Sequence, residues 1–85
     1  MKADAKTVKK LLNTAKGQIE GIGNMIDDNR YCIDISNQIL AAIAVLKKAN
    51  QTVIQAHLES CIRETLTDEG IQKINEIVNI INKIN

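Results

Sequence analysis

Hydrophobic residues recur at intervals of three and four through most of this chain, which is the pattern of amphipathic helices. The first such run extends from about residue 4 to residue 27, with Asp4 as a candidate N-cap. Its C-terminus carries two carboxylates and a turn-forming residue, Asp27, Asp28 and Asn29. Carboxylates at a helix C-terminus oppose the helix dipole, and Asn favours turns, so the first helix should stop there.

A second and longer run extends from about residue 31 to residue 66 and contains neither Gly nor Pro. Its weakest point is Gln51-Thr52, where a break in the helix is one alternative. A third run covers residues 68–84, with Thr67 and Asp68 as N-cap candidates. The pattern therefore predicts three helices, the middle one the longest.

The composition agrees with a single all-α domain over residues 1–85. The chain has no Pro, Trp or Phe and one Tyr, so a β-sandwich or barrel is close to excluded. Helices of such unequal length cannot cover each other's apolar faces within one small chain. We therefore expect an antiparallel helical hairpin that dimerises into a four-helix bundle, with the short third helix outside and a dimer of dimers as the final homotetramer.

Three glycines interrupt the first predicted helix, at positions 17, 21 and 23. Each costs roughly 1 kcal/mol relative to Ala in a helix interior. Gly17 and Gly21 are one turn apart and share a face, which favours close packing against another helix. The alternative is close approach to a ligand or to a DNA phosphate.

Several classes of function are excluded or disfavoured. No apolar run approaches the ~18 residues of a membrane span, and the first ten residues lack the apolar core of a secretory signal, so we expect a cytoplasmic protein with reduced cysteines. There is no Gly-rich phosphate loop and only one His. So small a chain has little room for a substrate cleft, and we expect no enzymatic activity.

The cysteines and the histidine lie on the long predicted helix. His57 and Cys61 are four residues apart, so both project from one helix face. Cys32 precedes His57 by 25 residues, or nearly 40 Å along a continuous helix. The three can meet only between two chains whose long helices run antiparallel, with Cys32 from one chain and the other two from its partner.

Two thiolates and one imidazole form a soft, three-coordinate set that suits Cu(I), whereas Zn(II) would require a fourth ligand. The same residues have a simpler explanation, because two buried cysteines and one hydrogen-bonded His are common in helical proteins. Spacing alone does not decide between these two interpretations.

The sequence resembles a known family at four segments: KGQIEGI (Lys16 to Ile22), RYCIDI (Arg30 to Ile35), QILAA (Gln38 to Ala42) and HLESC (His57 to Cys61). Together they are similar to the pattern of the copper-sensing repressor family, CsoR. The resemblance covers roughly residues 8 to 66. The predicted third helix shares only its general character with the family and none of these motifs.

This resemblance implies a Cu(I) site formed by Cys32, His57 and Cys61, in three-helix protomers that form dimers and tetramers. It also implies an outer shell that couples the metal to DNA, in which Tyr31 matches the family Tyr and Glu76 is the candidate Glu. Persulfide-sensing relatives lack the His, so His57 disfavours that branch. A thiol-based redox or sulfur sensor is a third, weaker interpretation.

The segments that contact DNA in this family differ here. Glu20 stands where the family has Arg, and Asn13, Asn24 and Ile43 stand at other positions that are often basic. The N-terminal segment carries cationic side chains that could contact phosphates instead, or could simply form a solvated helix face: Lys2, Lys6, Lys9, Lys10 and Lys16.

Two functions therefore compete. The first is a Cu(I) buffer or chaperone that serves a copper-transport protein and has weakened or lost operator binding. The alternative is a copper-responsive repressor that leaves its operator DNA when Cu(I) binds. The altered basic positions favour the buffer, and the resemblance itself favours the repressor.

Overall fold

The computed structural model describes residues 1–64 and 67–84, and residue 84 through its backbone only. Three α-helices follow one another: α1 (Ala5–Asp27), α2 (Cys32–Arg63) and α3 (Asp68–Ile84). The described residues contain no strand. The all-α, three-helix prediction is confirmed.

The first helix begins and ends at specific capping interactions. The Asp4 carboxylate accepts hydrogen bonds from the Thr7 backbone N–H (3.3 Å) and from the Thr7 hydroxyl (2.6 Å). The hydroxyl bond is the larger cause of a lowered Asp4 pKa, and the backbone bond adds to it. At the other end Asn29 has a positive φ of 52°, and Arg30 N–H donates to Met25 O (3.0 Å). This is a Schellman ending with Asn in the position that usually holds Gly.

The long helix α2 is continuous through Gln51 and Thr52, so the alternative of a break there is wrong. Within it, the Thr52 hydroxyl donates to Lys48 O (2.8 Å), a bond that helical backbone geometry accommodates. The helix ends at Arg63, and the predicted end at Leu66 lies outside the described residues.

The third helix begins with a side-chain cap from Thr67, whose hydroxyl accepts a hydrogen bond from Gly70 N–H (3.1 Å). The Lys73 ammonium in α3 lies 3.7 Å from the carboxylate of Glu64, the C-cap of α2, and this ion pair joins the two helices at the surface; its second partner, Glu69 at 3.9 Å, lies within α3. Ile77 is buried against Ile54 and Cys61 of α2.

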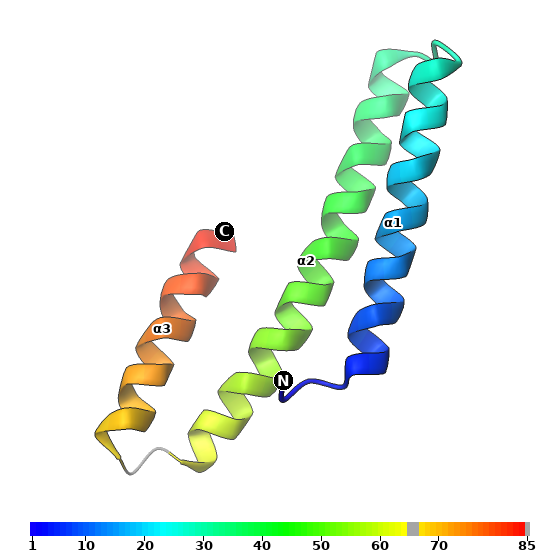
Figure 1. Cartoon of the computed structure of the whole chain (residues 1–85). Coiled ribbons are helices and arrows are strands. Elements are labelled where there is room, and N and C mark those ends of the chain that lie inside the picture. Colours follow the sequence, from blue (N-terminus) through cyan, green and yellow to red (C-terminus); the bar gives the residue numbers. More distant parts are fainter. Residues whose placement is uncertain (65–66, 85) are drawn as a thin grey trace.

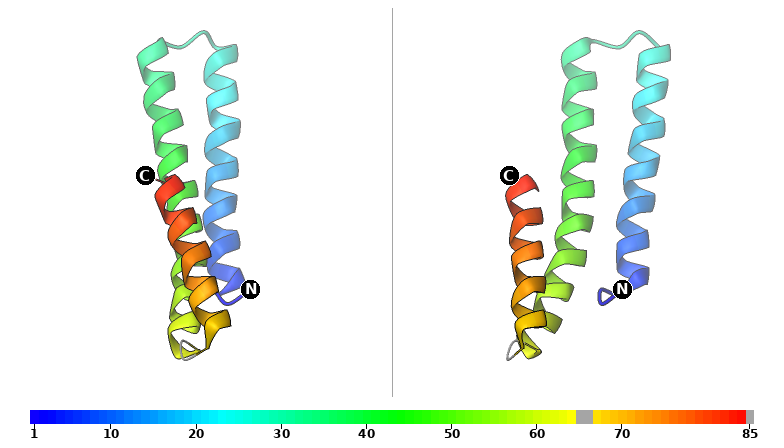
Figure 2. Two further views of the ribbon diagram at one scale, coloured as in Figure 1. Left: turned by 90° about the vertical axis from the view of Figure 1, so that its left-hand side faces the viewer. Right: turned by 60° about the vertical axis from the view of Figure 1, so that its left-hand side comes forward.

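The helices form one layer rather than a closed bundle. Figure 1 shows α1 and α3 on opposite sides of α2, and the turned views in Figure 2 agree. The Cα atoms span 56 × 25 × 11 Å, and 11 Å is less than the depth of two stacked helices. A layer this thin leaves large apolar side chains exposed, such as Leu40 (59 %) and Ile43 (51 %).

The three glycines of α1 have no packing partner in this chain. A Cβ placed on Gly17, Gly21 or Gly23 would meet nothing within 4 Å. Close packing of these glycines against another helix, the favoured interpretation of their spacing, is therefore not seen within this chain, and packing against a second chain stays a prediction. No helix among the described residues combines the length and the apolar character needed to cross a membrane.

Candidate metal centre

His57 and Cys61 lie one turn apart on α2, where the helix passes α3. The Cys61 side chain is only 2 % exposed, because it packs against Ile54 of its own helix and Ile77 of α3. The His57 side chain is exposed. Two donors one turn apart on a helix can share one metal ion.

Cys32 lies at the opposite end of α2. It is the first residue of the helix and its thiol is exposed. Tyr31, the N-cap residue beside it, is 66 % exposed. The helix places Cys32 roughly 38 Å from His57. Accordingly, the described part of the chain contains no cluster of three or more His, Cys, Asp or Glu side chains.

Glu76 of α3, the candidate outer-shell Glu, shares a cavity with His57 of α2. Both residues line a cavity of about 220 Å³ between α2 and α3. The rest of its lining is aliphatic: Val53, Ile54, Ile77 and Ile80. The third helix thus places a carboxylate where it could orient an imidazole that binds metal through its other nitrogen.

The exposed face of α2 carries the candidate ligands at both ends of one stripe. We define the α2 stripe as residues that recur at intervals of three, four or seven, all exposed: Cys32, Ile39, Ile43, Leu46, Asn50 and His57. In its middle lies a shallow hollow lined by Ile43, Leu46, Lys47 and Asn50. An apolar stripe of this spacing is typical of a helix that packs against another helix.

Comparison with known proteins decides the family. Residues 4–83 match the family described as metal-sensitive transcriptional repressors. The chain belongs to this family.

Two relatives of this repressor-family chain are named copper-sensing transcriptional repressor CsoR. The one from Bacillus subtilis strain 168 is 33 % identical over 73 residues, which are 85 % of this chain and 72 % of the relative. The one from Mycobacterium ulcerans strain Agy99 is 32 % identical over 71 residues, 82 % of this chain and 61 % of the relative. The chain thus spans less than two thirds of the mycobacterial protein.

Two solved structures resemble this repressor-family chain. The copper-sensing repressor CsoR with Cu(I) from Geobacillus thermodenitrificans NG80-2 superposes with a TM-score of 0.75 and 33 % identity, covering 92 % of this chain and 82 % of the other. The nickel-responsive transcriptional regulator InrS gives a TM-score of 0.82, covering 100 % and 97 %. At 19 % identity, InrS supports the fold alone.

The sequence reasoning missed the middle of the α2 stripe. It identified the ligands at the two ends but not that Ile43, Leu46 and Asn50 lie on the same face between them. The signal was present in the spacing, because Cys32 and Ile39 are seven apart and so are Asn50 and His57. In a chain of the repressor family, this stripe connects the candidate metal ligands to the surface on which a second chain would pack.

Proposed function

We propose that this protein is a Cu(I)-responsive transcriptional repressor, the function that sequence analysis held as the alternative to a copper buffer. Cys32 of one chain and the partner's His57 and Cys61 would bind one Cu(I). Their two thiolates and one imidazole match the soft, low-coordinate preference of this ion. The CsoR names of the relatives and the Cu(I)-bound CsoR structure support copper over nickel.

The observation that carries the proposal concerns two levels along α2. The level at which the candidate ligands require the twofold axis is also the level of the hollow in the α2 stripe. For Cys32 to lie level with the partner's His57–Cys61 turn, the twofold axis between antiparallel α2 helices must cross near the midpoint of positions 32 and 59, at about residue 46. The hollow of the stripe is lined by residues from Ile43 to Asn50 and is therefore centred at the same level. A homodimer through this stripe would also cover the exposed Ile39 and Leu46.

The surroundings of Cys61 suggest how metal binding could be transmitted. The Cys61 thiol is buried against Ile77 of α3. A metal ion bound to this thiol would therefore have to displace Ile77, and α3 with it. Glu76 on the same helix can accept a hydrogen bond from His57 and hold its ring in one orientation. In the proposal, α3 is the element whose position changes between the copper-free and the copper-bound states.

Two measurements test the function together. Anaerobic titration against a competing Cu(I) chelator should give one Cu(I) per chain, with affinity lost in Cys32→Ala and in Cys61→Ala. Ser60→Ala, beside Cys61, is the matched control and should keep the affinity. Glu76→Gln should weaken binding by about 10-fold or more. Equal affinity in all four variants would rule out this site.

The second measurement is an electrophoretic mobility shift on the DNA upstream of the protein's own gene. A repressor should form a specific complex without copper and release it when Cu(I) is added. The buffer remains the second candidate because Glu20, Asn13 and Asn24 are exposed on α1, where a DNA-binding face would benefit from cations. Tight Cu(I) binding without any complex on this DNA would establish the buffer, which would pass copper to a transport protein.

A further inference from the structure

One row of side chains runs along α2 at intervals of seven residues and differs in exposure between its two halves. We call it the heptad row: Ile33, Leu40, Lys47, Ile54 and Cys61. Ile54 and Cys61 are 8 % and 2 % exposed, because α3 packs on them through Ile77. Ile33 and Leu40 are 52 % and 59 % exposed. The N-terminal half of the row is thus as apolar as the C-terminal half, but no described part of this chain buries it.

The twofold axis of the proposed dimer divides the heptad row into matching halves. The axis crosses α2 at about residue 46, next to Lys47, which is the charged member of the row. Position 40 of one chain then lies level with about position 52 of the partner's α2, and position 33 with about position 59. The exposed half of the row therefore lies beside the half of the partner's α2 on which the partner's α3 packs.

The directions of contact around α2 bring α3 within reach of both chains. The α2 stripe, which faces the partner's α2 in the proposed dimer, and Ile54, which faces α3, are separated by about 50–60° around the helix. Packed helices lie about 8–10 Å apart. Two such spacings at this angle place α3 about 7–10 Å from the partner's α2 as well, so the three helices form a triangle in which each contacts the other two.

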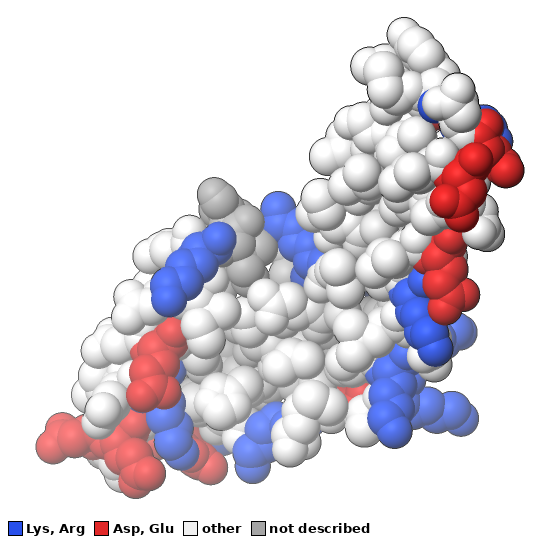
Figure 3. Space-filling model, turned by 45° about the horizontal axis from the view of Figure 1, so that its top comes forward, with Lys and Arg blue, Asp and Glu red and all other residues white. Residues whose placement is uncertain are grey.

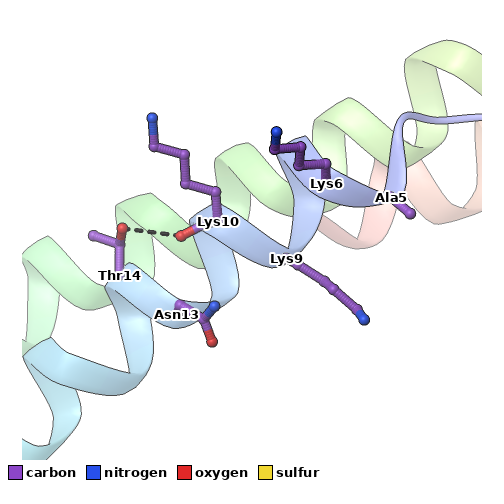
Figure 4. Close-up of a pocket in the computed structure, with 6 residues that line it drawn as sticks. All are labelled: Ala5, Lys6, Lys9, Lys10, Asn13 and Thr14. Carbon is purple, nitrogen blue, oxygen red and sulfur yellow. Dashed lines mark hydrogen bonds between the residues drawn. The ribbon is translucent and has the colours of Figure 1, made fainter.

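The distribution of charge agrees with burial of α2 and with α3 as its cover. Figure 3 shows Lys, Arg, Asp and Glu side chains over α1 and α3 at the two sides of the molecule, and mostly uncharged surface over α2 between them. The partner's α1 is a poor cover for Leu40 because its outer surface is polar. In Figure 4, Lys6, Lys9 and Lys10 extend from this helix.

The edge of α3 nearest the partner carries an exposed apolar residue at the level of the partner's Leu40. Ile80 is 42 % exposed and lines a cavity with His57, a member of the α2 stripe. Val53 and Ile54 line the same cavity, so Ile80 lies level with about position 52 of its own α2. Ile80 is therefore the residue of α3 that faces Leu40 across the two chains.

The length of α3 fits this arrangement. The helix ends at Ile84, which lies level with about position 48 of α2 and short of the axis at about position 46. Two α3 helices can therefore lie end to end along the pair of α2 helices without overlapping. Lys47 lies at the level where their ends meet, which accounts for the one charge in an otherwise apolar row.

We infer that each α3 is shared between the two chains: Ile77 packs on its own α2, and Ile80 packs on the partner's Leu40. The inference rests on the dimer of the proposed function and adds a second contact between the chains, outside the α2 stripe. The third helix then ties together the two chains whose residues form each proposed copper site.

Paired cysteines test this contact in the full chain carrying Cys32→Ser and Cys61→Ser. Ile80→Cys combined with Leu40→Cys should form a disulfide-linked dimer on mild oxidation, since facing residues of packed helices lie within reach of a disulfide. Within one chain the two positions lie about 18 Å apart along α2, so the link must join two chains. Val78→Cys with Leu40→Cys is the matched control and should not link, because Val78 is 46 % exposed but lies on the other edge of α3.

Sedimentation supplies a second measurement. Leu40→Ala and Ile80→Ala should each weaken the dimer by at least about tenfold, because each removes two apolar contacts per dimer, and Val78→Ala should leave the dissociation constant unchanged. A protein that dimerises and binds one Cu(I) per chain, but links no faster through the Ile80 pair than through the Val78 pair, would overturn the shared helix and leave the proposed function intact. A folded monomer at micromolar concentration would overturn both.

Discussion

A single cysteine at position 46 should link two copies of the protein to each other. Leu46 is 41 % exposed, so its replacement leaves the described chain intact. Packed helices lie about 8–10 Å apart, and Cα atoms lie about 2.3 Å from each helix axis, so facing Cα atoms are about 4–5 Å apart. That is within reach of a disulfide, and position 46 on the twofold axis faces its own copy.

The neighbouring positions provide the control. Ile39 is seven residues from Leu46, so the two copies of residue 39 would lie about 21 Å apart along the helices, and Ile39→Cys alone should not cross-link. Combined with Val53→Cys it should, because 39 and 53 are equally far from the axis. All variants carry Cys32→Ser and Cys61→Ser, which removes both native thiols.

Mild oxidation followed by non-reducing electrophoresis measures the cross-linked fraction, and sedimentation of the reduced protein reports the dimer. Ile39→Cys linking as fast as Leu46→Cys would refute the position of the axis, and a folded monomer at micromolar concentration would refute the dimer. Because this background has no copper ligand other than His57, the result tests the interface without the metal.

Three further predictions concern stability. Asn29→Gly should raise the free energy of unfolding and Asn29→Ala should lower it by about 1 kcal/mol, because only the glycine adopts the positive φ without cost; the reverse order in urea would contradict the Schellman ending. Ile77→Ala should cost about 2–4 kcal/mol and Val78→Ala, 46 % exposed, far less; equal costs in urea would show that α3 does not pack through Ile77. The Asp4 pKa lies below its ordinary value of 3.8 in the folded state, so the cap stabilises above that pH and is lost as pH falls through the folded pKa. Asp4→Asn should therefore flatten the acid limb of stability against pH, and an unchanged limb would argue against the cap.

Much of the helical structure followed from the sequence because its signals are local. Asp4 caps the helix that it was expected to begin, and the helix stops at Asp27. Of the two N-cap candidates for α3, Thr67 is the residue whose side chain caps the helix. Only the suspected break at Gln51-Thr52 was wrong, since a Thr hydroxyl can bond to the preceding turn without ending a helix.

Only some features of the metal site could be predicted from the sequence, because some depend on residues close together in the chain and others on contacts between helices or between chains. The turn between His57 and Cys61 is local, and spacing predicted it. The burial of Cys61 beneath Ile77 depends on where α3 packs, which no spacing within α2 specifies. The position of Cys32 relative to the other two depends on a second chain. It therefore remains a prediction, as do the roles of Tyr31 and Glu76.

The uninterrupted length of α2 has a consequence for how two copper sites would influence each other. A helix of 32 residues without Gly or Pro has no hinge, so it moves as a rigid rod about 48 Å long. In the proposed dimer each site joins the start of one rod to the end of the other. A change of about 5° in the crossing angle would displace each rod end by about 2 Å relative to the other rod and would alter both sites equally. The first Cu(I) to bind would set the geometry that the second encounters, so the two sites should not load independently, and a stepwise Cu(I) titration of the dimer would measure the coupling.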